Sequence, residues 1–355
     1  MAQAREFIFG PWRAVTVLGV TQILTWGILF YPPVLTIPLI AKTHGWSISF
    51  AMGGFSVGLF VAGLVAPRVG ALIDRYGGHV VMAAGSLIAA VALVALVNAT
   101  HPIAYLAVWM LIGVAMSAQL YDAAFASLGR IFGAGARPPI TTLTLAGGFA
   151  STVGWPVARV LLDHLGWRGT YLIYAAVFVV VAAPLHAFLL PRVRAISAAP
   201  GPGAVSTPRA VVPSRGTTFI LVAAAFGAYA FVPSGLAAHL LAIFAREGID
   251  STTVVWIGAL CGPAQVAARL IEFAFGRNVH PLWVARIALV VLLSGFLMLA
   301  FAGFAVTTAA AFALMFGGAN GLITITRGAL PLALFGPSGY GRLLGRLAGP
   351  VQIMQ

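Results

Sequence analysis

A small set of polar side chains interrupts the long apolar stretches of this chain, and these residues are the ones that could do chemistry. Asp122 follows Gln119 by three residues, and Arg269 follows Gln265 by four, so each pair would share one helix face. A charge in hydrocarbon costs at least about 2.5 kcal/mol, so it marks a transport pathway by default. A carboxylate can bind and release a proton, and a guanidinium can hold a carboxylate through two parallel hydrogen bonds. The sequence therefore predicts a substrate or proton pathway that comprises Gln22, Gln119, Asp122, Gln265, Arg269 and Asn320.

Each of these residues also has a structural interpretation. Asp122 either titrates or contacts the substrate, or it makes a helix-to-helix hydrogen bond near the inner leaflet. Arg269 either binds the substrate or lies at a cytoplasmic helix end, where Glu272, three residues later, would pair with it. Gln22 either faces the pathway or is a polar packing residue. The sequence leaves these alternatives open.

One enzyme-like motif in the chain has a better structural interpretation. Gly54–Gly58 has the G-x-S-x-G spacing of a nucleophile elbow, but it lies inside an apolar helix, where its glycines fit a close helix-packing face better. The single cysteine, Cys261, excludes internal disulfides and a cysteine-based metal site. The chain has no G-x-x-x-x-G-K-[ST] loop, so ATP coupling is not supported. We therefore expect no enzyme activity, no cofactor and no metal site.

The elements that must position these residues are membrane-spanning helices. The 355 residues are 61% hydrophobic and only 8% charged, with a mean hydropathy of +1.02. This composition excludes a soluble enzyme, a nucleic-acid-binding domain and a disordered chain, because a soluble surface needs more polar cover. About 20 apolar residues span a bilayer. Ten such stretches are predicted near residues 13–41, 47–67, 79–98, 103–129, 139–163, 168–190, 217–245, 252–274, 281–301 and 305–335.

The basic residues predict the orientation of these spans. The formal net charge is +13, and with a cytoplasmic N-terminus 16 of the 20 basic residues fall on or toward the inner side. The positive-inside rule therefore accounts for the excess charge without a nucleic-acid partner. We expect a multi-pass protein of the cytoplasmic (inner) membrane. Its expected partners are the lipid bilayer and a small-molecule substrate, with protons as a candidate second substrate and no obligate protein partner.

The spans fall into two groups. Residues 191–216 are rich in proline and arginine and are predicted to form a cytoplasmic linker between a six-helix bundle, 1–190, and a second bundle, 217–355. A short internal repeat supports this division, because Val65–Arg68 resembles Val266–Arg269. The second bundle is expected to hold four complete spans and the start of a fifth, cut off in the eleventh span.

The loop after the second predicted span carries the most specific motif. It includes Gly70, Asp74, Arg75 and Gly77, in the pattern G-x-x-x-D-R-x-G. This pattern resembles the signature loop of the major facilitator superfamily, although Gly78 and His79 stand where two basic residues are usual. Asp74 is expected to pair with Arg75 or Arg130, or to accept hydrogen bonds from the amides of a helix N-terminus. The resemblance implies a gating role for Gly70, Asp74, Arg75, Gly77 and Arg130, and the alternative is a solvated ion pair in a turn.

Softer motifs resemble the bacterial monocarboxylate-transporter-like branch of that superfamily. They lie at Gly45–Met82, Gly166–Arg168 and Gly321–Gly336. The resemblance implies an all-α fold of two six-helix bundles and alternating access to a central site. It also implies that Arg269 contacts a substrate carboxylate, although Gln265 replaces the aspartate that precedes this arginine in relatives. We therefore expect a secondary active transporter of a small organic solute, either a carboxylate or an amphiphile. The alternative is a non-transporting membrane sensor or assembly factor on the same scaffold.

Overall fold

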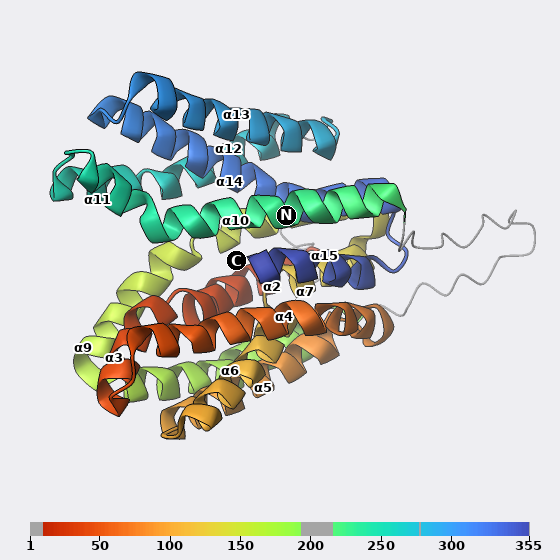
Figure 1. Cartoon of the computed structure of the whole chain (residues 1–355). Helices are drawn as coiled ribbons and strands as arrows, with labels where there is room; N and C mark the ends of the chain where they lie inside the picture. Colours follow the sequence, from red (N-terminus) through yellow and green to blue (C-terminus); the bar gives the residue numbers. More distant parts are fainter. Residues whose placement is uncertain (1–9, 193–215, 277, 355) are drawn as a thin grey trace, which may run out of the picture.

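The computed structural model describes residues 10–192, 216–276 and 278–354, and within these ranges the chain is helical and contains no strand. Most of the predicted linker lies outside them. The long helices run roughly parallel to one another in two groups (Figure 1). This arrangement confirms the predicted all-α membrane fold, in which each backbone amide is satisfied within its own helix.

The N-terminal half, as we call residues 13–189, contains the first six predicted spans. A π-helical turn precedes α3, which begins at Pro33, and α9 contains a kink at Gly166, where φ is +65°. Its elements are α2 (Arg13–Thr25), η1 (Trp26–Phe30), α3 (Pro33–His44), α4 (Ile48–Tyr76), α5 (Gly78–Asn98), α6 (Pro102–Gln119), α7 (Tyr121–Phe132), η2 (Gly133–Ala136), α8 (Arg137–Gly147), α9 (Ala150–Val177), η3 (Phe178–Ala182) and η4 (Leu185–Leu189).

The C-terminal half, residues 217–354, contains the remaining helices. They are α10 (Thr217–Arg246), α11 (Ser251–Ala259), α12 (Cys261–Phe275), α13 (Pro281–Ala302), α14 (Val306–Phe335) and α15 (Tyr340–Met354). In the described residues, seven helical runs are long and apolar enough to cross a membrane. One of them, Pro102–Leu189, comprises three predicted spans. The predicted span 252–274 is divided into α11 and α12, and each of these two helices is too short to cross a membrane alone.

The predicted fourth span is also divided, because the helix breaks at Leu120, whose backbone is extended between α6 and α7. The break frees the carbonyl of Gln119, which accepts a hydrogen bond from Nε2 of Gln22 at 2.6 Å. The side chain of Gln119 in turn donates to the carbonyl of Met82. A buried carbonyl without a partner would cost about 1–3 kcal/mol, so Gln22 stabilises the break. Asp122 consequently lies in the first turn of α7, where the helix dipole favours a negative charge.

Helix α15 packs along α4 and so joins the C-terminal half to the N-terminal half (Figure 1). Glycines on both helices permit the contact. A Cβ atom on Gly70 would collide with the backbone of Gly341, and one on Gly345 would collide with the backbone of Ala66. Small residues let helix backbones approach closely in membranes. This packing brings the N-terminus of α15 to the C-terminal end of α4.

Candidate functional site

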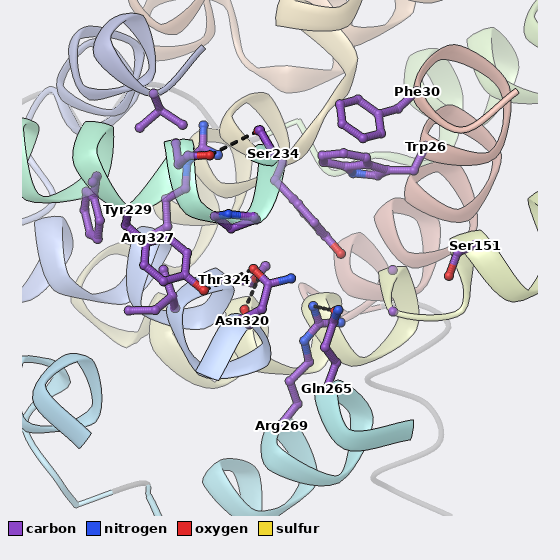
Figure 2. Close-up of a pocket in the computed structure, with 18 of the residues that line it drawn as sticks. Trp26, Phe30, Ser151, Tyr229, Ser234, Gln265, Arg269, Asn320, Thr324 and Arg327 are labelled. Atoms are coloured by element: carbon purple, nitrogen blue, oxygen red, sulfur yellow. Dashed lines mark hydrogen bonds between the residues drawn. The ribbon is translucent and has the colours of Figure 1, made fainter. Parts of the chain in front are cut away.

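A cavity of about 460 Å³ lies between the two halves. In Figure 2, side chains from η1, α9, α10, α12 and α14 surround it. Its volume falls within the usual range for small-molecule sites. Its polar lining includes Ser151, Ser234, Gln265, Asn320 and Thr324. Its aromatic lining consists of Trp26, Phe30, Tyr31, Tyr121, Phe125, Phe226, Tyr229 and Phe316.

Arg269 brings a buried positive charge to this cavity from α12, with only 3% of its surface exposed. Its Nη1 donates to the carbonyl of Thr144 at 2.8 Å, and its Nη2 lies 3.4 Å from Oε1 of Gln265. In the part of the chain that the structure describes, its buried Nε has no hydrogen-bond partner. Among the described residues, no carboxylate forms an ion pair with Arg269. The guanidinium therefore keeps donor capacity for an anion.

A second arginine in the cavity wall is neutralised. Nη2 of Arg327, on α14, lies 2.6 Å from Oδ2 of Asp122, on α7, and both side chains are largely buried. This ion pair joins the two halves. Asp122 offsets the charge of Arg327, whereas no ion pair among the described residues offsets the charge of Arg269.

Glu272, one turn after Arg269, does not pair with it. Its Oε1 lies 2.9 Å from Nη2 of Arg137, and its Oε2 accepts from the hydroxyl of Thr141 at 3.2 Å. The last turns of α12 pack against the start of α8, so Glu272 faces the N-terminal half. The interpretation in which Arg269 is held at a helix end by Glu272 is therefore wrong.

The loop motif forms another contact between the halves. The carboxylate of Asp74 accepts hydrogen bonds from the backbone amides of Gly341 and Arg342, at 3.0 and 2.9 Å, at the N-terminus of α15. Arg130 donates to the backbone carbonyl of Asp74. Arg75 instead lies over the ring of Tyr76, with its Cζ 5.0 Å from the ring centroid. The expectation that the Asp74 carboxylate accepts hydrogen bonds from the amides of a helix N-terminus therefore agrees with the structure.

Gly77 has a φ of +89°, which favours glycine, and it separates α4 from α5. Such a sharp turn lets Asp74 approach α15 while α5 runs back into the bundle. The residues of the loop motif are therefore brought together at one end of α4.

Comparison with known proteins identifies the family of this chain. Residues 15–349 match the sequence model of the Major Facilitator Superfamily. The chain belongs to the major facilitator superfamily. It is therefore a multi-pass membrane protein of the secondary-transporter type, and transporters of this superfamily bind small-molecule substrates.

Solved major facilitator structures share this fold at low sequence identity. The human organic anion transporter MFSD10 (TETRAN) has a TM-score of 0.73 and 18% identity, over 97% of this chain and 91% of that one. The transporter FucP in its outward conformation has a TM-score of 0.70 and 13% identity, with coverages of 96% and 89%. The proton:xylose symporter XylE has a TM-score of 0.63 and 13% identity, with coverages of 96% and 86%. No curated protein sequence matches the chain.

Within a major facilitator fold, the contacts between the halves indicate which side of the cavity is closed. The Asp74 contact with α15 and the Arg137–Glu272 pair lie at the end where α4 turns into α5 and α12 ends. In the predicted orientation this is the cytoplasmic end. We refer to these contacts as the inner contacts.

Removing the charge of Asp74 should loosen the inner contacts. Asp74→Asn weakens the cap on α15, and a helix cap is worth about 0.5–2 kcal/mol. In a Cys261→Ser background, Thr141→Cys reports on the opening, because Thr141 is buried against Glu272. We expect Asp74→Asn to raise the labelling rate of this cysteine by a membrane-impermeant thiol reagent several-fold.

The matched control for this measurement is Glu247→Gln, which removes an exposed carboxylate from the far end of α10. It should leave the labelling rate unchanged. Equal rates for the parent and Asp74→Asn would show that the Asp74 cap does not hold the halves together.

The remaining predicted pathway residues divide between the cavity and the helix break. Gln265 and Asn320 line the cavity, and Asn320 accepts a hydrogen bond from the hydroxyl of Tyr229 at 3.3 Å. Gln22 and Gln119 are fully buried and bond to backbone carbonyls around the break at Leu120. Gln22 also accepts from Nε1 of Trp26, which lines the cavity, at 3.1 Å. These two amides position cavity residues.

Sequence reasoning missed two polar groups. Arg327 is one of the 16 basic residues that the positive-inside pattern places on or toward the inner side, yet a charge inside the predicted span 305–335 is itself a signal for a site. His186 is fully buried in η4, and its ring nitrogens lie 3.1 Å from the hydroxyl of Ser86 and 3.0 Å from that of Thr21. Nothing near His186 in the sequence indicated these partners, which lie on α2 and α5.

Proposed function

We propose that this chain is a secondary active transporter that carries a small organic anion across the cytoplasmic membrane by alternating access. One observation carries the proposal: Arg269 is buried in an aromatic cavity without an acidic partner among the described residues. A buried charge is stable only when it is paired or hydrogen-bonded, so an anionic ligand would complete this site.

The shape of the guanidinium favours a carboxylate. Its Nη1 is directed to the carbonyl of Thr144, which leaves the edge formed by Nε and Nη2 for a ligand. This edge offers two parallel donors, the geometry that fits the two oxygens of a carboxylate. The 3.4 Å contact with Gln265 is long, so a carboxylate would displace it readily.

The aromatic wall favours a substrate with a flat apolar body. On the N-terminal side the rings of Trp26 and Tyr121 lie 5.2 Å apart, and those of Trp26 and Phe30 lie 4.8 Å apart. Arg269 projects from the C-terminal half on α12 (Figure 2). An arylcarboxylate would place its ring on the aromatic side and its carboxylate on Arg269. We assign the chain to the monocarboxylate-transporter-like branch on this chemistry. The name of the similar human organic anion transporter supports an anionic substrate and does not indicate a branch.

Asp122 is the proton carrier in this proposal. Gln265 cannot titrate, and Asp122 is an acid next to the cavity that bonds across the two halves. Protonation of Asp122 would release Arg327 and weaken a contact between the halves, so proton binding and movement would be linked. The N-terminus lies in the cytoplasm, and residues 1–190 and 217–355 are the two moving bundles, joined by 191–216.

A thermal-shift measurement on the purified chain tests the binding part of this proposal. A ligand at 100 times its Kd stabilises the folded state by about 2.7 kcal/mol. We expect benzoate and 1-naphthoate to raise the Tm, and benzamide and 1-naphthamide, which have the same rings without the charge, to leave it unchanged. Equal shifts for the acids and their amides would contradict an anion site.

A further inference from the structure

The inner contacts fix how α8 and α12 are aligned. Arg137 pairs with Glu272, and seven residues further along α8 the carbonyl of Thr144 accepts from Arg269. Residue numbers rise along α8 while they fall along α12, so the two helices run antiparallel. These contacts therefore define a register between them.

The same alignment of residues can be extended from α8 and α12 along the helices that adjoin them, α9 and α11. α8 continues into α9 after a bend at Gly148, and α11 continues into α12 after Leu260. Arg159 lies 22 residues after Arg137, which is about 33 Å along a helix. The Arg137–Glu272 pair places Arg159 opposite residue 250, and the Thr144–Arg269 contact places it opposite residue 254. Asp250 is the one acid in the interval 250–254.

The helix faces agree with this alignment. Arg159 lies 18 residues after Thr141, which is about five full turns, so both point to the same side of the helix. Thr141 contacts Glu272 on the C-terminal half, so this spacing places Arg159 on the helix face that is turned toward that half. The guanidinium of Arg159 is 72% exposed and pairs within α9 with Asp163 at 2.9 Å.

Asp250 lies at the start of the opposite helix and is exposed. Its Oδ1 accepts from the backbone amide of Thr253 at 3.0 Å, so it caps α11. An aspartate in a cap can accept from a guanidinium without losing its capping bond, because an ionised carboxylate has about four acceptor positions.

We propose that Arg159 and Asp250 form an ion pair that closes the outer end of the transporter when the inner contacts open. Major facilitator halves rock as rigid bodies about a central site, so separating the inner ends of α8 and α12 brings the outer ends of α9 and α11 together. Arg159 then turns from Asp163 to Asp250. This assignment requires only that the halves rock, so it stands or falls independently of the anion proposed above.

The pair balances the Arg137–Glu272 pair at the other end. Each access state then keeps one arginine–carboxylate contact between the same two spans, with the arginine on the N-terminal half in both cases. Neither state gains a large excess of contacts, which keeps the two states close in energy and lets a ligand shift their populations.

Cysteine cross-linking in membranes tests the register. In the Cys261→Ser background, Arg159→Cys is combined with Asp250→Cys or with the control Glu247→Cys, which lies in the same loop but outside the interval. A third variant combines Arg137→Cys with Glu272→Cys. A short bifunctional thiol reagent should link the 159/250 pair several-fold faster than the 159/247 pair. Adding Asp74→Asn, which loosens the inner contacts, should speed the 159/250 reaction and slow the 137/272 reaction.

Two results would overturn the proposal. One is a 159/247 rate that equals or exceeds the 159/250 rate. The other is a change of the 159/250 and 137/272 rates in the same direction on adding Asp74→Asn.

Charge exchange tests the ion pair itself. Arg159→Glu and Asp250→Arg should each favour the state with the inner contacts closed and so speed the 137/272 reaction. The double variant, Arg159→Glu with Asp250→Arg, should return the 137/272 cross-linking rate to the parent value. If its rate differs from the parent rate as much as the rates of the single variants do, the ion pair is excluded. If a reversed-charge variant does not fold, the cysteine pairs still decide the question.

Discussion

Replacing Arg269 by lysine should raise the KM for an arylcarboxylate by about 10- to 100-fold. The substitution keeps the positive charge but removes the planar fork that offers two parallel donors. A hydrogen bond to a charged group contributes about 1.5–3 kcal/mol, and each 1.4 kcal/mol is a factor of ten in affinity. The measurement is the concentration dependence of benzoate uptake into proteoliposomes.

The matched control is Arg286→Lys. Arg286 lies on α13 outside the cavity, where its Cζ is 4.8 Å from the centroid of the Trp283 ring. Both substitutions preserve the net charge and the positive-inside pattern, and only the first one touches the cavity. An unchanged KM in the Arg269→Lys variant would show that Arg269 does not bind the substrate.

Replacing Asp122 by asparagine should abolish uptake driven by a pH gradient and leave substrate exchange intact. Exchange needs no net proton movement, whereas uphill uptake requires a group that gains and loses a proton. Asparagine keeps an oxygen that can accept from Arg327, so the contact between the halves is weakened rather than removed. The measurement compares pH-driven uptake with counterflow in the same proteoliposomes.

Two further variants separate coupling from folding. Glu247→Gln removes a carboxylate from an exposed position and should retain pH-driven uptake. The double variant Asp122→Asn with Arg327→Gln removes both charges of the pair. It therefore leaves no buried arginine without its carboxylate, a defect that would destabilise the fold by about 3–5 kcal/mol. Retained uphill uptake in Asp122→Asn would exclude the coupling role, and loss of the folded protein would favour a structural role.

Local sequence signals predicted the helices and the loop motif well. Apolar stretches of sufficient length predicted the helices, and the loop that carries the motif lies, as expected, after the second predicted span, where Gly77 separates α4 from α5. The break at Leu120 had no such signal, because neither proline nor glycine occurs there. It is stabilised by Gln22, which lies 97 residues away in the sequence, and only the packed bundle shows this contact.

The pairing of charges depended on how the two halves dock. Arg327 and Asp122 are 205 residues apart, and Arg137 and Glu272 are 135 residues apart. Helical spacing favoured a pair between Arg269 and Glu272, but the packing of α12 on α8 directs Glu272 to Arg137 and leaves Arg269 to the cavity. The spacing of residues along one helix indicates which ion pairs could form within that helix. Which ion pairs actually form depends on the contacts between the two halves.

The most direct test of the account is counterflow in proteoliposomes that contain the purified chain. Vesicles loaded with unlabelled benzoate are diluted into a trace of radiolabelled benzoate or of radiolabelled benzamide. If Arg269 binds the substrate carboxylate, we expect transient accumulation of the labelled acid, none of the amide, and loss of the signal at this trace concentration in the Arg269→Lys variant. Binding of benzoate without any flux by intact, folded protein would contradict transport and favour a sensor, and equal flux of acid and amide would contradict an anion site at Arg269.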